Sequence, residues 1–220
     1  MAFERDRQQM IADIESGVAV TRRMTGRDHF NPRVMKVMHQ VPREDFVPTD
    51  MRHVAFRDGA LPVGHGQTIS QPYIVALMTD LLDLTEDSVV LEIGTGTGYQ
   101  AAILSRLARQ VYTIEKIPQL AQSAQRRLRE MGYDNVEARC SDGYLGWPEK
   151  APFDGIVVTA AAPEIPPALL EQLGPGGRMV IPIGLPYMHQ ELILITRDQQ
   201  GETASSSILG VAFVPLVKGA

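Results

Sequence analysis

The sequence predicts an α/β fold built on a doubly wound, mostly parallel sheet, with helices before it and an antiparallel addition at its end. Three observations support this prediction. From residue 88 onward, strand-like and helix-like segments alternate. Residues 153–160 form a continuous apolar run, typical of a parallel strand that is buried on both faces. The chain then ends in strand-like segments, with no clear helix between the last two.

The 220 residues are few enough for a single domain. We expect residues 1–70 to form an appendage of helices and loops on a core of residues 71–220. Apolar residues at positions 10, 11, 14 and 18 recur with helical spacing. Asn31 and Pro32 predict the cap and first turn of a second helix that runs to about Val41. Prolines and glycines then make residues 42–66 an irregular stretch. A loop of that length is usually functional or disordered, and its apolar residues favour the functional interpretation.

The core begins with a strongly amphipathic helix from Pro72 to Leu82. Further strands are predicted at residues 88–93, 110–115, 135–139, 153–160, 178–183, 191–196 and 207–216. Further helices are predicted at residues 101–108, 119–131 and 166–173, the last one stopped by the glycines of residues 174–177.

Composition excludes several classes of function. Lys and Arg number 21 against 26 Asp and Glu, a net charge of −5, whereas a protein that grips nucleic acid through its phosphates normally has a basic surplus. The single cysteine, Cys140, excludes an intrachain disulfide, and we expect it to be a small buried side chain. The five histidines show no metal-ligand spacing. We therefore expect no metal and no nucleic acid.

The termini and the hydropathy pattern predict a cytoplasmic protein. The first ten residues mix acids and bases without an apolar segment, so no secretory signal is visible. No stretch approaches the ~18 apolar residues that a membrane span needs.

A glycine loop follows the first core strand, in VLEIGTGTGYQ (residues 90–100). The strand runs directly into Gly94, Gly96 and Gly98, and glycines here permit positive φ and let a ligand approach the backbone. Glu115 ends the next strand, 21 positions after Gly94. In dinucleotide-binding folds an acid about 20 residues on accepts the ribose hydroxyls. The unit therefore predicts a site for an adenosine-like ligand.

The spacing of the glycines favours S-adenosylmethionine over a nicotinamide cofactor. The dinucleotide fingerprint places its third glycine three positions after the second, which Gly98 does not satisfy. Glu92 stands in the strand just ahead, where a carboxylate would repel a pyrophosphate and attract ammonium and sulfonium charges. A structural glycine turn that binds no ligand is the weaker interpretation, because Glu92 and Glu115 both stand where a ligand site of this kind would need them.

Asp142 and Gly143 follow the third core strand and place another acid at the carboxyl edge of the sheet, where open α/β folds bind ligands. An adenine amino group could donate to Asp142. Taken alone, Ser-Asp-Gly is more often only a turn.

The polar loop GHGQTISQP (residues 64–72) abuts the start of the amphipathic helix. The positive end of a helix suits an anion, and the hydroxyls of Thr68 and Ser70 could hydrogen-bond to a carboxylate. On these residues alone, the favoured alternative is that Ser70 only caps the helix.

With these motifs in place, the sequence resembles the protein-L-isoaspartate O-methyltransferases. The resemblance covers about four-fifths of the chain in one register, and the GQTISQP loop joined to the glycine loop is its most specific part. The matching segments are VPREDFVP (41–48), residues 60–82, residues 90–104, APFDGIVVTAAAPEIP (151–166), LGPGGRMVIPIG (173–184) and FVPL (213–216).

The resemblance implies a Rossmann-like methyltransferase sheet and repair of damaged protein. The family transfers a methyl group from S-adenosylmethionine, leaving S-adenosylhomocysteine, to the α-carboxylate of an L-isoaspartyl residue. The ester closes to a succinimide that reopens partly to normal aspartate. The implied partners are isoaspartyl proteins and peptides, and we expect the enzyme to be a monomer without membrane contact.

Carried over to this sequence, the resemblance makes Ser70 the active-site serine. Thr68 and Ile69 share its loop beside the cofactor. The remaining implied cofactor residues are Glu92, Gly94, Gly96, Gly98, Glu115, Asp142 and Gly143.

Two positions depart from the family pattern. Ala212 stands immediately before the FVPL segment, where bacterial members often carry an arginine, so the source of positive charge near the substrate is open. Ser141 replaces a glycine on the adenine side. The resemblance also implies that FVPL is a strand near the peptide substrate.

The chemistry of the reaction agrees with the residues. A carboxylate is ionised at pH 7 and needs no general base, so catalysis should depend on in-line positioning. We assign Ser70 to orienting that carboxylate. The rival functions are a methyltransferase of RNA or of a small molecule, a binding module without turnover, and a nicotinamide oxidoreductase.

Overall fold

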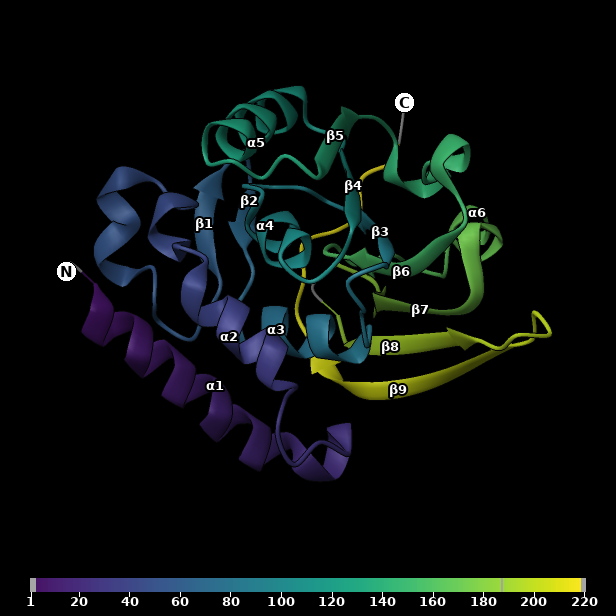
Figure 1. Cartoon of the computed structure of the whole chain (residues 1–220), viewed down its shortest axis with the longest axis horizontal. Helices are drawn as coiled ribbons and strands as arrows, with labels where there is room; N and C mark the ends of the chain where they lie inside the picture. The colour runs from purple at the N-terminus through teal and green to yellow at the C-terminus, as the bar shows by residue number, and fades with distance from the viewer. Residues whose placement is uncertain (1–2, 187, 219–220) are drawn as a thin grey trace.

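A seven-stranded sheet in the order β5-β4-β3-β6-β7-β8-β9 lies at the centre of the computed structural model, which describes residues 3–186 and 188–218 (Figure 1). Strands β3 to β7 run parallel to one another, whereas β8 and β9 are added antiparallel. This arrangement confirms the predicted fold class. The strands are β3 (Val89–Ile93), β4 (Gln110–Glu115), β5 (Val136–Cys140), β6 (Phe153–Val158), β7 (Leu173–Gly184), β8 (Gln190–Arg197) and β9 (Thr203–Val211).

The strand order reverses between β3 and β6, and this reversal positions the site. Open α/β sheets bind ligands outside the carboxyl ends of their strands at such a point. The register continues past the strands, since the Gly94 amide donates to the Ile114 carbonyl at 2.8 Å and the Thr159 amide donates to the Ile93 carbonyl at 2.9 Å. The loops after β3, β4 and β6 therefore meet at one edge.

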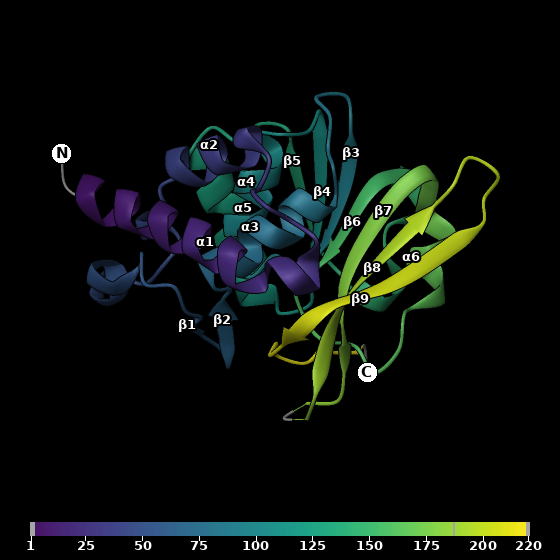
Figure 2. The same cartoon turned by 90° about the horizontal axis from the view of Figure 1, so that it is seen from below.

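Helices cover the two faces of the sheet unequally. In Figure 2, α1 to α5 lie on one side of the sheet and α6 lies on the other. Alternate strand residues supply both cores: Val90 packs toward the larger helical layer, and Leu91 packs toward α6 and Trp147. The helices are α1 (Glu4–Thr25), α2 (Pro32–Gln40), α3 (Pro72–Leu81), α4 (Tyr99–Ser105), α5 (Pro118–Glu130) and α6 (Pro167–Gln172), with 3₁₀ turns η3 (Gly143–Leu145) and η4 (Pro148–Lys150).

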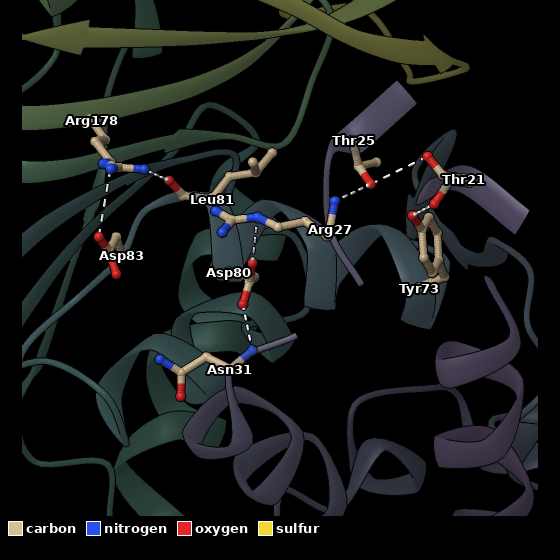
Figure 3. A network of polar contacts seen from close by, with 9 residues as sticks. All are labelled: Thr21, Thr25, Arg27, Asn31, Tyr73, Asp80, Leu81, Asp83 and Arg178. Atoms are coloured by element: carbon tan, nitrogen blue, oxygen red, sulfur yellow. Dashed lines mark hydrogen bonds and ion pairs between the residues drawn. The ribbon is translucent and has the colours of Figure 1, made fainter. Parts of the chain in front are cut away.

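Partly buried polar contacts tie the N-terminal segment to α3 (Figure 3). Asn31 caps α2 as predicted, because its side chain accepts the Arg33 amide. The carboxylate of Asp80 on α3 accepts the Asn31 amide at 2.6 Å and pairs with Arg27 at 3.1 Å. Residues before the core are thus fixed to the helix that carries the site's polar loop.

The irregular stretch contains structure that the sequence did not predict. Two 3₁₀ turns, η1 (Arg43–Asp45) and η2 (Thr49–Val54), precede an antiparallel hairpin of β1 (Leu61–Gly64) and β2 (Gln67–Ile69). The hairpin turns through Gly64, His65 and Gly66, whose φ values of 92°, 53° and 69° are the left-handed values that tight hairpins need. The hairpin carries Thr68 and Ile69 toward the sheet edge.

Three sequence expectations about the C-terminal half were wrong. Residues 174–177 do not stop α6 by a glycine turn, because β7 begins already at Leu173. The last strand ends at Val211, and residues 213–216 turn away to pair through Pro215 with Ala161. Cys140 is exposed because β5 is an edge strand.

None of the helices within the described residues has the length and apolar character of a membrane span.

Candidate active site

Three adjoining hollows lie at the carboxyl edge of the sheet. The β3–β4 cleft is lined by Ile93, Gly94, Gly96, Ile114, Glu115, Lys116, Ile117, Gly143, Thr159, Ala160, the hairpin residues Gln67 and Thr68, and Val214 to Val217. The inner cleft is lined by Thr68, Ile69, Ser70, Val75, Glu92, Gly94, Thr95, Gly96, Thr97, Tyr99, Gln100 and Thr159. The β9 cleft, of about 590 Å³, is lined by Ala60, Thr68, Ser70, Gln71, Ile74, residues 188–190 and residues 210–213. Thr68 lines all three, and Ser70 lines the last two.

The glycine loop presents bare backbone to two of these clefts. Gly94 and Gly96 line both the β3–β4 cleft and the inner cleft. Gly94 has a φ of 96°, and an added Cβ would clash with the Thr159 hydroxyl, which donates to the Gly94 carbonyl at 2.6 Å. Gly98 lines neither cleft; it precedes α4 and packs against Leu128. Of the three predicted cofactor glycines, Gly94 and Gly96 therefore border the clefts and Gly98 does not.

Glu115 holds the loop as well as lining the β3–β4 cleft. Its carboxylate accepts the Gly96 amide at 2.8 Å and the Ile117 amide at 2.9 Å. Each carboxylate oxygen can accept more than one hydrogen bond, so both retain capacity for a ligand hydroxyl.

Glu92 lines the inner cleft from beneath the glycine loop. It is fully buried, and one carboxyl oxygen hydrogen-bonds to the Thr113 hydroxyl at 2.5 Å. The other, Oε1, has no hydrogen-bond partner among the described residues. Burial raises the pKa of Glu92 to about 8, and the nearby charge of Glu115 adds to the effect while the Thr113 contact opposes it. Burial therefore favours the protonated form of Glu92, whereas the sequence analysis expected an ionised carboxylate at this position.

Asp142 and Gly143 lie at the same edge with different roles. Gly143 lines the β3–β4 cleft. The Asp142 side chain accepts the Tyr144 amide at 2.9 Å and so caps η3.

Ser70 does not cap α3. The first residue before the helix is Gln71, and the Tyr73 amide is accepted by Asp58 at 3.2 Å, which also accepts the Gln71 side chain at 2.8 Å. The Ser70 side chain is half-buried between the inner cleft and the β9 cleft. The alternative interpretation of Ser70 as a helix cap was therefore wrong.

Sequence reasoning missed two parts of the site. Thr159 locks Gly94 and lines two clefts; its position directly after a buried parallel strand, at the edge where ligands bind, was the available signal. The second is Gln190, which is buried on β8 and exchanges hydrogen bonds of 2.7 and 3.1 Å with the backbone of Phe213. Such a clamp between distant residues leaves no local pattern in the sequence.

Among the described residues, no group of three or more His, Cys, Asp or Glu side chains is placed to hold a metal ion.

The sequence model of the family described as protein-L-isoaspartate(D-aspartate) O-methyltransferase matches residues 20–220. The chain belongs to this family.

Curated relatives with this description are similar over nearly the whole chain. Protein-L-isoaspartate O-methyltransferase 2 of Syntrophobacter fumaroxidans is 56% identical over 97% of this chain and 86% of its own length. The enzyme of the same name from Nitrosococcus oceani is 54% identical over 95% of both chains.

Solved structures agree on the fold. A structure of a protein-L-isoaspartate O-methyltransferase superimposes with a TM-score of 0.80 at 28% identity, over 95% of this chain and 65% of that longer chain. A Plasmodium falciparum protein described as belonging to the same family, solved with S-adenosyl-L-homocysteine, gives a TM-score of 0.75 at 24% identity, over 94% of this chain and 98% of its own.

Family membership gives the reaction. The protein is an S-adenosylmethionine-dependent protein-L-isoaspartate O-methyltransferase, which acts in isoaspartyl repair. The residues fit this cofactor, because the loop offers bare backbone at Gly94 and Gly96 and the inner cleft holds a buried carboxyl oxygen, Glu92 Oε1, without a partner.

Proposed function

We propose that the cofactor and the isoaspartyl residue meet at Thr68 and Ser70, where the three clefts join. The observation that carries this proposal is the shared lining: Thr68 belongs to all three clefts, and Ser70 faces both the inner cleft and the β9 cleft. A ligand in the β3–β4 cleft and a peptide in the β9 cleft would therefore approach each other only across this loop.

In this proposal the residues of the β3–β4 cleft would hold the adenosine part of the cofactor. The Glu115 carboxylate would accept hydrogen bonds from the ribose hydroxyls, and Asp142 and Gly143 would border the adenine. Gly94 and Gly96 would lie under the methionine part, Gly98 sets the turn into α4, and the cationic groups of the bound cofactor would favour the ionised form of the Glu92 carboxyl. When bound, the cofactor supplies an electrophilic methyl group on a sulfonium.

The protein's contribution to the chemistry is orientation. The isoaspartyl carboxylate is already ionised at pH 7, so no side chain needs to remove a proton. The Ser70 hydroxyl donates a hydrogen bond to one carboxylate oxygen and directs the other toward the methyl group, while Thr68 and Ile69 form the adjoining wall. Holding reacting atoms in line is worth several orders of magnitude in rate.

The test offers labelled cofactor with an isoaspartyl peptide and its normal-aspartyl twin, to the natural enzyme and to Ser70→Ala. We expect a base-labile methyl ester on the isoaspartyl peptide only, and much slower formation by the variant. Label on RNA, or on both peptides equally, would contradict the proposed substrate. A fully active Ser70→Ala would contradict the role of Ser70.

We further propose one domain, 1–220, in which residues 1–70 form the substrate-side appendage of the 71–220 core. Ala60, Thr68 and Ser70 of this appendage line the β9 cleft, which supports this assignment.

We also propose that the enzyme is a cytoplasmic monomer that uses no nucleic acid or membrane. The net charge of −5 is consistent with an enzyme that binds no nucleic acid. Light scattering after size-exclusion chromatography measures the mass of the enzyme in solution, and the mass of a dimer would contradict the proposed monomer.

A further inference from the structure

Arg43 is a fully buried charged side chain that the proposed chemistry does not use. It lies in η1, within the VPREDFVP segment, and none of its surface is exposed. No carboxylate of the described residues lies within 4.0 Å of its guanidinium. The neighbouring Glu44 pairs instead with Arg7 of α1, at 2.7 Å. Burying an arginine without an ion-pair partner is expensive, so its contacts must repay that cost.

The contacts of Arg43 converge on the active-site loop. Nη2 donates to the backbone carbonyl of Ser70 at 2.7 Å, and Nε donates to the carbonyl of Ala55 at 2.7 Å. The guanidinium carbon lies 4.8 Å from the centre of the Tyr99 ring, in a cation–π contact. Tyr99 begins α4 directly after the glycine loop and lines the inner cleft. One side chain thus touches the segment before the hairpin, the serine loop and the cofactor loop.

The rigid fork of a guanidinium suits this task better than an ammonium. Its donors have fixed directions, so two carbonyls and an aromatic face are held in a set relation. The Ser70 carbonyl lies in the extended link between β2 and α3, and this link has no cap from Ser70's own side chain. The orientation of the Ser70 hydroxyl therefore depends on what holds its backbone.

We propose that Arg43 is a positioning residue for methyl transfer, which fixes the Ser70 loop against the cofactor loop by holding the Ser70 carbonyl and packing on Tyr99. This inference rests on the proposed role of Ser70. Arg43 acts through Ser70 and touches neither the methyl group nor the substrate.

A double-mutant cycle tests the inference. Arg43→Lys keeps the charge and most of the volume but loses the fork. We expect it to lower kcat for an isoaspartyl peptide about tenfold when Ser70 is present, because small misplacements of reacting groups are costly. In the Ser70→Ala background the same substitution should lower kcat less than about threefold, because the group it positions is already gone. KM and the dissociation constant of S-adenosylhomocysteine should change less than about threefold.

The control is Arg197→Lys. Arg197 also donates to backbone carbonyls, those of Leu170 and Leu173, and none of these three residues lines a cleft. Arg197→Lys should leave kcat unchanged, both with Ser70 present and in the Ser70→Ala background. Equal losses from Arg43→Lys in both backgrounds would show a merely structural role and overturn the inference. If Ser70→Ala alone were fully active, the proposed function of Ser70 would fail, and the positioning inference would fail with it. If Arg43→Lys does not fold, Arg43→Gln is measured in the same cycle.

Discussion

Ser70 has its hydroxyl available because another residue does the capping. Asp58 accepts the Tyr73 amide at the start of α3, and the Ser70 side chain faces the junction of two clefts. From the sequence alone a serine just before a helix is most simply a cap, so its role depended on the resemblance to the family. The competing carboxylate, Asp58, lies 15 positions before Tyr73, beyond any local capping pattern.

The first residue-scale prediction concerns Ser70→Ala. Removing a hydrogen bond to a charged group costs about 1.5–3 kcal/mol. We therefore expect kcat to fall about 10- to 100-fold, while the affinity for S-adenosylhomocysteine stays the same within about threefold. Initial rates and titration calorimetry measure the two quantities. Equal losses in both would move Ser70 to the cofactor site.

The second residue-scale prediction concerns Glu92, whose pKa is raised by burial from 4.5 to about 8 in the folded enzyme. Between these values the unfolded chain carries an ionised carboxylate and the folded chain a protonated one. The contribution of Glu92 to stability is therefore complete below pH 4.5 and is lost as the pH rises toward 8, by about 1.4 kcal/mol per pH unit. Urea unfolding of the natural enzyme and of Glu92→Gln should give a free-energy difference that grows in favour of the variant across this range. A difference independent of pH would show that Glu92 is ionised when buried.

At the scale of the elements, the site is made where the β1–β2 hairpin, α3 and the loop after β3 come together. The sequence identified α3 and the glycine loop, because amphipathic spacing and glycines after a strand are local signals. It did not identify the hairpin, whose strands of four and three residues are too short for an alternating pattern. Nor did it separate residues 213–216 from β9, since the pairing with Ala161 depends on tertiary structure.

The element-scale prediction concerns the start of α3. Asp58→Ala removes the acceptor of the Tyr73 amide and of the Gln71 side chain, and should lower the free energy of unfolding by about 1 kcal/mol. Ser70→Ala is the matched control and should change it by less than about 0.5 kcal/mol, because its side chain caps nothing. Chemical denaturation measures both. The reverse ranking would restore Ser70 as the cap.

At the scale of the whole molecule, the N-terminal helices are fixed to the sheet through α3. The order of strands and helices from residue 88 onward was predictable, because parallel strands buried on both faces are continuously apolar. The polar link between the N-terminal segment and α3 was not, since Arg27 and Asn31, the partners of Asp80, lie about fifty positions away from it (Figure 3).

The prediction at this scale compares two aspartates near the end of α3. The Asp80 side chain is 4% exposed, and Asp80→Asn should cost about 2 kcal/mol of stability because a charged, buried acceptor is lost. The Asp83 side chain is 66% exposed and pairs with Arg178 at 3.5 Å, so Asp83→Asn should cost less than about 0.5 kcal/mol. Thermal and urea unfolding of the two variants measure these stability costs. Similar costs would show that the Asp80 contacts do not hold the N-terminal helices.

A crystal structure of the enzyme with S-adenosylhomocysteine and an isoaspartyl peptide tests the role of Ser70 most directly. We expect the peptide in the β9 cleft, with one oxygen of its α-carboxylate at hydrogen-bond distance from Ser70 Oγ, about 2.5–3.0 Å, and the other oxygen directed toward the sulfur. A carboxylate bound elsewhere, with Ser70 facing only solvent or the cofactor, would contradict that role.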